Sequence, residues 1–184
     1  MTNENGIFVI SKDEARLLAA FASADPTLAA LVRVVFRPAE GSATASDGHT
    51  IVRCNGAAKT GHPEFGVPRA AIERAAKAAR KGESIVVGPT GVDVAGITIA
   101  VAQDDTLRYV QSIEKVKDSA PGADVAPGVA IGVNAKYLAR VTLIAAAAES
   151  AGGKITIQPI TDSWDAIRVT AGSVSALIMP MRLD

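Results

Sequence analysis

The sequence predicts an α+β fold built from one repeated unit, a strand followed by a helix and then three more strands, present three times. Short apolar runs alternate at the period of a β-strand, and three longer runs carry apolar residues at the period of a helix. Glycine-containing turns separate these runs in the same order in each copy. A chain of 184 residues that is 48% hydrophobic can bury one good core or two small ones.

The first copy occupies about residues 7–55. Ser11 is a good N-cap for its helix, and Asp13 and Glu14 stand in the first turn, where the helix dipole favours acidic side chains. Asp25 and Pro26 break the helix after about residue 24. Strands are expected at residues 7–10, 31–37, 41–46 and 50–54, with Asp47 and Gly48 forming the turn before the last of them.

The second copy occupies about residues 64–102. Its strand at residues 65–67 leads into a helix from Pro68 to about Lys81, because proline suits the first turn of a helix. Gly82 ends this helix. The three strands that follow are expected at residues 84–87, 92–95 and 97–101.

The third copy occupies residues 128–184, where Asn134 caps a helix expected over residues 135–150. A strand at residues 129–133 precedes this helix, and strands at 154–159, 166–170 and 175–181 follow it. We therefore expect a complete domain of two half-domains at residues 1–103, a connector at 104–127 and a single half-domain at 128–184.

Composition limits the class of protein. Lys and Arg number 19 and so do Asp and Glu, so any attraction to nucleic acid must come from a local patch. The single cysteine, Cys54, excludes an internal disulfide and fits a reducing compartment. The N-terminal residues lack the pattern of a signal peptide, and no apolar run is long enough to span a membrane. We expect a cytoplasmic protein with no membrane partner.

The helix of the second copy carries a local basic patch. At the helical period its cations fall within a little under half of the circumference, opposite a face of alanines and Ile72. The helices of the other two copies each add a pair of cations spaced i,i+4. Such charges are usually a solvated face, but three helices in register also suit a surface for the phosphates of duplex DNA. The candidate DNA-binding residues are Arg69, Arg74, Lys77, Arg80, Lys81, Lys12, Arg16, Lys136 and Arg140.

No catalytic constellation is evident. His49 and His62 are the only histidines, and no serine stands in a nucleophile motif. Asp104 and Asp105 are adjacent carboxylates of a kind common in polar loops. The glycine pairs lack the lysine of a phosphate-binding loop. We expect no enzyme activity, no catalytic residues, no metal site and no cofactor.

The last strand runs almost to the end of the chain and holds Met179 and Met181 around Pro180. One interpretation is a final core strand in which methionine fills gaps. The other is a surface that accepts short apolar peptides, because methionine is flexible and polarizable.

Two segments resemble a known family. Ser46-Asp47-Gly48-His49 resembles the Thr-Asp-Gly-His turn of the bacterial replicative sliding clamp, the β subunit of DNA polymerase III, and Met179-Pro180-Met181-Arg182-Leu183 resembles the C-terminus of that family. Residues 134–138 resemble the start of the helix in the last half-domain of the clamp, and the repeated unit matches the half-domain from which clamps are built.

The resemblance implies a non-enzymatic ring around duplex DNA, with helices lining a basic hole and sheets outside. It also implies a pocket, between the last two domains, into which polymerases and repair proteins insert a short apolar peptide. By position, one wall of the pocket would comprise Ser46, Gly48, His49, Thr50 and Ile51, and the other Leu177, Met179, Pro180, Met181 and Arg182.

The sequence departs from the family in three respects. Thr50 stands where the family usually has arginine, Asp184 follows the usual final leucine, and three half-domains replace six. An unpaired half-domain favours self-association as a dimer, or as a tetramer whose four chains would supply twelve half-domains. Two alternatives stay open: a clamp-derived peptide-binding or regulatory module that does not encircle DNA, and a small enzyme on an unrelated α+β fold.

Overall fold

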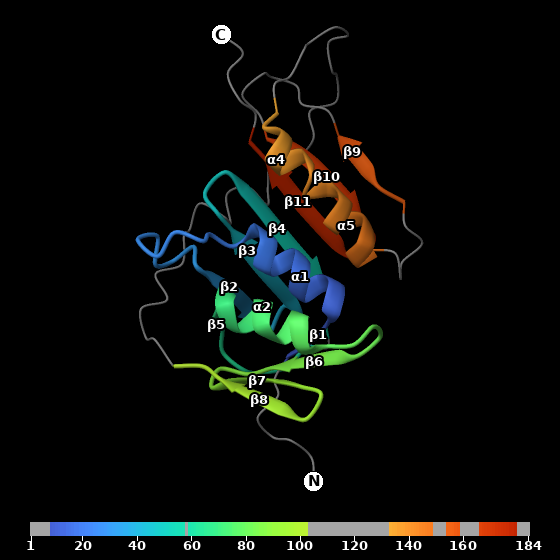
Figure 1. Cartoon of the computed structure of the whole chain (residues 1–184). Coiled ribbons are helices and arrows are strands. Elements are labelled where there is room, and N and C mark those ends of the chain that lie inside the picture. The colour runs from blue at the N-terminus through green and yellow to red at the C-terminus, as the bar shows by residue number, and fades with distance from the viewer. Residues whose placement is uncertain (1–7, 58, 103–132, 149–153, 159–165, 180–184) are drawn as a thin grey trace, which may run out of the picture.

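In a computed structural model of the chain, the structure describes residues 8–57, 59–102, 133–148, 154–158 and 166–179. These residues form two antiparallel sheets with helices packed against them, which confirms the predicted α+β class. Three helices, α1, α2 and α5, lie side by side on one face, with α1 in the middle (Figure 1).

The first copy of the repeated unit has the predicted element order. It comprises β1 (Phe8–Ser11), α1 (Lys12–Phe21), β2 (Arg33–Arg37), β3 (Ser42–Ser46) and β4 (Thr50–Asn55). Ser11 is the N-cap of α1, and its side chain and that of Glu14 each accept the other's backbone N–H in a capping box. The helix ends at Phe21, before the Asp25-Pro26 break predicted from the sequence, because the backbone is already extended at Ala22.

The second copy repeats this order with β5 (Phe65–Pro68), α2 (Arg69–Ala78), β6 (Ser84–Val87), β7 (Gly91–Val94) and β8 (Ile97–Ala100). The predicted helix is three residues too long at its C-terminus. Ala79 has an extended backbone, so α2 ends before the glycine that was expected to stop it.

The first strands of these two copies are exchanged. β1 pairs with β6 of the second copy, and β5 pairs with β2 of the first. The exchange builds one core from both copies, where the ring of Phe36 stacks on that of Phe65, with centroids 5.3 Å apart, and meets the edge of Phe8 at 5.2 Å. Residues 8–102 of the described chain therefore fold around a shared interior.

The third copy contributes α4 (Ala135–Leu138), α5 (Val141–Ala148), β9 (Thr156–Gln158), β10 (Ile167–Ala171) and β11 (Val174–Ile178). The prediction of one helix over residues 135–150 is wrong within the described residues, because a turn at Ala139 and Arg140 divides it. The N–H groups of Leu143 and Ile144 donate to the carbonyl oxygen of Arg140, so α5 starts afresh from that residue. Apart from Val133, the strand expected at residues 129–133 lies outside the described residues, so the count of three half-domains stays a prediction.

The third copy extends the sheet of the first. β11 pairs antiparallel with β4, which gives a seven-stranded sheet in the order β5-β2-β3-β4-β11-β10-β9 beside the four-stranded sheet β1-β6-β7-β8. The register places Leu177 opposite Ile51 and Ile178 opposite Thr50. This pairing places the described part of the second predicted pocket segment beside the first.

Candidate peptide pocket and cationic helix surface

The described residues of the two predicted pocket walls lie side by side where β4 and β11 pair. Beyond the last paired residues, the backbone N–H of Met179 donates to the carbonyl oxygen of His49 at 3.0 Å. Met179 is 47% exposed, a high value for a large apolar side chain beside a paired strand. Apolar surface is thus presented to solvent at the junction of the two segments.

The rim turn, residues 46–51, is built by its own side chains. Oδ1 of Asp47 accepts the N–H groups of His49 at 3.1 Å and Thr50 at 2.8 Å. Oγ of Ser46 accepts the N–H of Gly48 at 3.1 Å. Gly48 has φ +92°, a conformation that glycine adopts without strain. The Asp-Gly turn predicted from the sequence therefore forms, because aspartate caps the turn and glycine permits its backbone.

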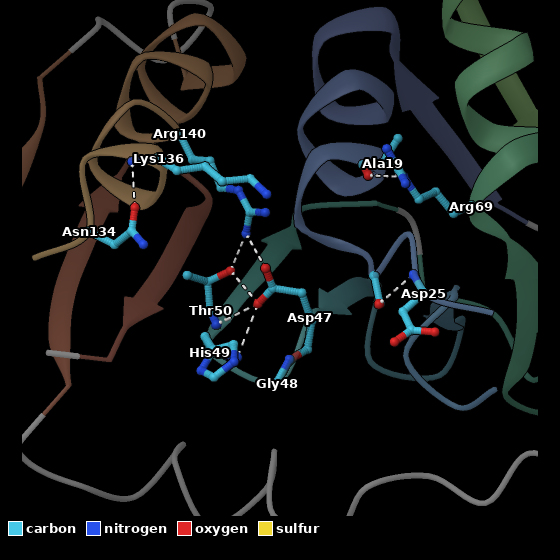
Figure 2. A network of polar contacts seen from close by, with 12 residues as sticks. Ala19, Asp25, Asp47, Gly48, His49, Thr50, Arg69, Asn134, Lys136 and Arg140 are labelled. Atoms are coloured by element: carbon cyan, nitrogen blue, oxygen red, sulfur yellow. Dashed lines mark hydrogen bonds and ion pairs between the residues drawn. The ribbon is translucent and has the colours of Figure 1, made fainter. Parts of the chain in front are cut away.

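Arg140 reaches the rim turn from the third copy. Its Nη1 lies 2.7 Å from Oδ2 of Asp47 and also donates to Oγ1 of Thr50 (Figure 2). The side chains of Arg140 and Asp47 are only 12% and 14% exposed. Helical spacing predicted Arg140 on the solvent-facing basic surface, and the structure instead buries its guanidinium against a carboxylate, because the turn before α5 directs it inward.

Two aromatic rings complete the surroundings of Arg140. Its guanidinium carbon lies 5.1 Å from the ring centroid of Phe21 and 5.2 Å from that of Tyr137. The ring of Tyr137 in turn stacks on the ring of His49, with centroids 6.0 Å apart. The sequence prediction did not include Tyr137 in the pocket, and no spacing signal indicates a contact between residues so far apart in the chain.

The ion pair changes the acidity of Asp47. Burial alone raises the pKa of this carboxyl, but hydrogen bonds from Arg140 and from the N–H groups of Thr50 and His49 outweigh that effect. The pKa of Asp47 therefore lies below its ordinary value, and the group is ionised at neutral pH.

The residues predicted to line the pocket differ in exposure. Ser46 and Thr50 are buried, Ile51 and Leu177 are half-buried, and Gly48 and His49 are exposed. Leu31 lies beside the turn, since a Cβ on Gly48 would lie 3.5 Å from its Cδ1. Pro180, Met181 and Arg182 lie outside the described residues.

The second candidate site is a groove of about 510 Å³ between α1, α2 and α5. Four of the nine predicted DNA-binding cations line it, together with Glu73 and small apolar side chains. Arg74, Arg80, Lys81 and Lys136 are exposed outside the groove. The lining residues are Lys12, Arg16, Ala19, Ala20, Arg69, Glu73, Ala76, Lys77 and Leu143.

Several of these cations have partners in the protein. Nζ of Lys12 donates to the carbonyl oxygen of Ala79, and Nε of Arg69 donates to that of Ala19 at 2.8 Å. Oε1 of Glu73 lies 2.8 Å from Nζ of Lys77, and Oε2 of Glu73 lies 3.9 Å from Nη2 of Arg69. The hydrogen bond from Lys77 lowers the pKa of Glu73, so this carboxylate remains charged in the groove. The cationic helix surface is defined as the exposed and groove-lining cations of α1 and α2 together with Arg80 and Lys81, which follow α2. It is therefore partly neutralised.

Three further features of the described residues concern a reactive thiol, metal binding and membrane insertion. Burial raises the pKa of the Cys54 thiol, which makes it a poor nucleophile. Among the described residues, no cluster of three or more His, Cys, Asp or Glu side chains could hold a metal ion. None of the described helices has the length and apolar character needed to cross a membrane.

No family profile and no curated protein matches the sequence. Among solved structures, the chain is similar to the β sliding clamp of Caulobacter crescentus, with TM-score 0.60 and 20% identity over 100% of this chain and 67% of that chain. DNA polymerase III β subunits from Pseudomonas aeruginosa and Thermotoga maritima both match with TM-score 0.61, at 15% and 10% identity. These matches cover 96% of this chain and 66% and 65% of the two clamps.

The chain thus spans about two thirds of the length of these clamps. At this level of identity the match concerns the fold and not a shared activity. The fold is that of the bacterial β sliding clamp, as the two sequence segments predicted.

Proposed function

We propose that this protein is a clamp-like, non-enzymatic scaffold that holds duplex DNA without sequence preference and docks short apolar peptides of a DNA polymerase or another partner. The hydrogen bond between Met179 and His49 carries the proposal, because it joins the two segments predicted from the sequence to be the walls of one pocket. The exposed side chain of Met179 at this junction is suited to an apolar peptide anchor.

The helix arrangement supports the DNA part of the proposal. Cations of two helices border one groove, and phosphates can be bound through such charges without contacts to base edges. Phosphate binding of this kind weakens steeply with salt. Arg140 is not included in this surface, because its charge is engaged by Asp47.

The DNA part can be tested by reversing two exposed cations, Lys77 near the C-terminus of α2 and Arg80 just beyond it. We expect the double variant Lys77→Glu/Arg80→Glu to bind a fluorescent DNA duplex at least about tenfold more weakly at low salt, with a shallower salt dependence. Lys59→Glu/Lys154→Glu is the matched control, since it reverses two exposed lysines outside the helices. Equal affinity of both double variants would exclude the cationic helix surface as the binding site.

The peptide part has its own test. We expect a fluorescein-labelled hexapeptide with two leucines and one phenylalanine to bind the protein, and Met179→Glu to abolish the binding. Replacing exposed Ile97 by glutamate on β8 is a control for the added charge. Equal binding by wild type and Met179→Glu would contradict a pocket at this position.

A peptide-binding or regulatory module that does not encircle DNA is the second candidate. The balance of 19 basic and 19 acidic residues and the neutralising contacts of Glu73 favour it. It predicts peptide binding without measurable binding of duplex DNA at physiological salt.

Self-association to a dimer or tetramer is part of the proposal for a ring. Light scattering at micromolar concentration, with and without DNA, measures the mass directly. A strict monomer under both conditions would exclude a closed ring and favour the module. In either case we expect the protein to act in the cytoplasm.

A further inference from the structure

We infer that Arg140, in the turn between α4 and α5, is a positioning residue for the rim turn of the proposed peptide pocket, supported by Tyr137 of α4. The inference deepens the proposed peptide function and rests on it. It assigns to the third copy a role beyond the pairing of its strand β11 with β4. The sequence analysis placed Arg140 on the DNA-binding surface and included Tyr137 in no site.

A continuous series of contacts connects Arg140 to the pocket. Its guanidinium binds Oδ2 of Asp47, while Oδ1 of the same carboxylate accepts the N–H of His49. The carbonyl oxygen of His49 accepts the N–H of Met179. The position of the Asp47 carboxylate therefore determines where the backbone of His49 lies, and with it the exposed Met179 that follows β11.

Burial restricts the movement of the side chains that make these contacts. Both side chains of the ion pair are less than 15% exposed, and Thr50, whose hydroxyl also contacts Arg140, is 1% exposed. Removal of the guanidinium would leave the Asp47 carboxylate without its charged partner in a largely dry environment. We expect the carboxylate to move toward water and to release the N–H groups that it holds.

The aromatic contact acts on the side chain of His49. Its ring stacks on Tyr137 with an interplanar angle of 23°, and the other neighbour of Tyr137 in this cluster is the Arg140 guanidinium. The orientation of an exposed pocket residue is thus supported from α4. The side chain of His49 is therefore supported by α4, and its backbone is held through Asp47 by Arg140 in the turn that follows α4.

A structural ion pair that merely joins the third copy to the first is the competing explanation. It predicts that loss of Arg140 lowers the stability of the whole fold without a specific effect at Met179. Positioning predicts a local effect at the pocket that exceeds the global one. The two explanations differ in the hydrogen exchange of a single amide, which needs no bound peptide.

The experiment compares Arg140→Ala, Arg140→Lys and Tyr137→Ala with Lys154→Ala, a control that removes the charge of an exposed residue of the third copy. Native-state hydrogen exchange of the Met179 amide and the Kd of the fluorescein-labelled hexapeptide are measured in each. We expect Arg140→Ala to accelerate exchange and to raise Kd about tenfold each. Arg140→Lys, which keeps the charge, should recover part of both effects. Tyr137→Ala should raise Kd severalfold, and Lys154→Ala should change neither quantity.

Three further outcomes are decisive. If Met179 exchange and peptide Kd in Arg140→Ala stay within twofold of wild type while the Tm falls, the inference is wrong and the pair is only structural. If wild type binds no peptide, the proposed function fails, and Met179 exchange still decides the positioning role. If Arg140→Ala does not fold, Arg140→Lys supplies the test, and unchanged exchange and Kd in it and in Tyr137→Ala overturn the inference.

DNA binding tests independently whether Arg140 acts at the rim turn and not on the DNA-binding surface. We expect Arg140→Ala to bind duplex DNA with an affinity within twofold of wild type, because its charge does not face the groove. A loss as large as that of Lys77→Glu/Arg80→Glu would return Arg140 to the DNA surface and overturn its assignment to the pocket.

Discussion

Nε of Arg69, at the start of α2, donates to the carbonyl oxygen of Ala19, in the last turn of α1, at 2.8 Å. The last carbonyl groups of a helix have no partner within the helix, and the C-terminal end of its dipole favours a cation. Arg69 therefore joins the two neighbouring helices in addition to lining the groove.

This contact predicts that replacement of Arg69 lowers the stability of the fold more than replacement of the exposed Arg74 on the same helix. We expect Arg69→Ala to lower the free energy of unfolding by about 1 kcal/mol, since it removes a charge-assisted hydrogen bond at a helix end. Urea unfolding followed by circular dichroism measures the change. Arg74→Ala, at an exposed position of the same helix, should change stability by less than about 0.5 kcal/mol. Equal losses in the two variants would contradict the role assigned to Arg69.

The left-handed backbone of Gly48 predicts that any side chain at this position lowers the stability of the fold. We expect Gly48→Ala to destabilise the fold by about 1–2 kcal/mol, because φ +92° disfavours a residue with a Cβ. Space is not the cause, since the nearest atom would lie at 3.5 Å. Gly61→Ala is a matched control, as its new Cβ would meet no atom within 4 Å. The idea fails if both variants unfold at the same denaturant concentration.

The lowered pKa of Asp47 predicts a pH dependence. Its folded pKa lies below its unfolded pKa of about 3.9. The ionised group therefore stabilises the fold fully above the unfolded pKa, and this contribution is lost as pH falls through the folded pKa. We expect wild type to lose more stability than Asp47→Asn between about pH 5 and pH 3, as measured by urea unfolding at each pH. Parallel curves for the two proteins would show that Asp47 does not contribute.

The ion pairs of Glu73 with Lys77 and Arg69 predict that removal of its charge increases the affinity for DNA. We expect Glu73→Gln to strengthen binding of a DNA duplex about two- to fivefold at low salt, because it releases Lys77 and Arg69 from a competing carboxylate. Asp93→Asn, on β7 away from the helices, changes the net charge equally and should have a smaller effect. Fluorescence anisotropy at two salt concentrations measures both, and equal gains would indicate a general charge effect.

Local signals in the sequence predicted most elements and the rim turn. Ser11, Asp47 and Gly48 act through neighbours within three residues, so their chemistry can be read without knowledge of the fold. The same holds for the alternation in the strands. Helix ends were less accurate, because the glycine and proline signals lie beyond the residues at which α1 and α2 become extended.

Long-range contacts decided what the sequence left open. The exchange of β1 and β5 depends on which strands can share a core around Phe36, and no local pattern encodes that choice. Arg140 has the spacing of a surface residue, yet its side chain meets Asp47, 93 positions away along the chain. It also contacts Thr50, which stands where the resemblance implies an arginine, so a guanidinium reaches this turn from another element.

The sequence by itself therefore determined the α+β units, the rim turn and the two segments that resemble a sliding clamp. Only the tertiary structure decided which cations face the groove and which side chains contact the rim turn. The physical reason is the range of the interactions. Turns and helix caps are fixed by adjacent residues, whereas the burial and pairing of a charge are fixed by whatever the fold packs against it.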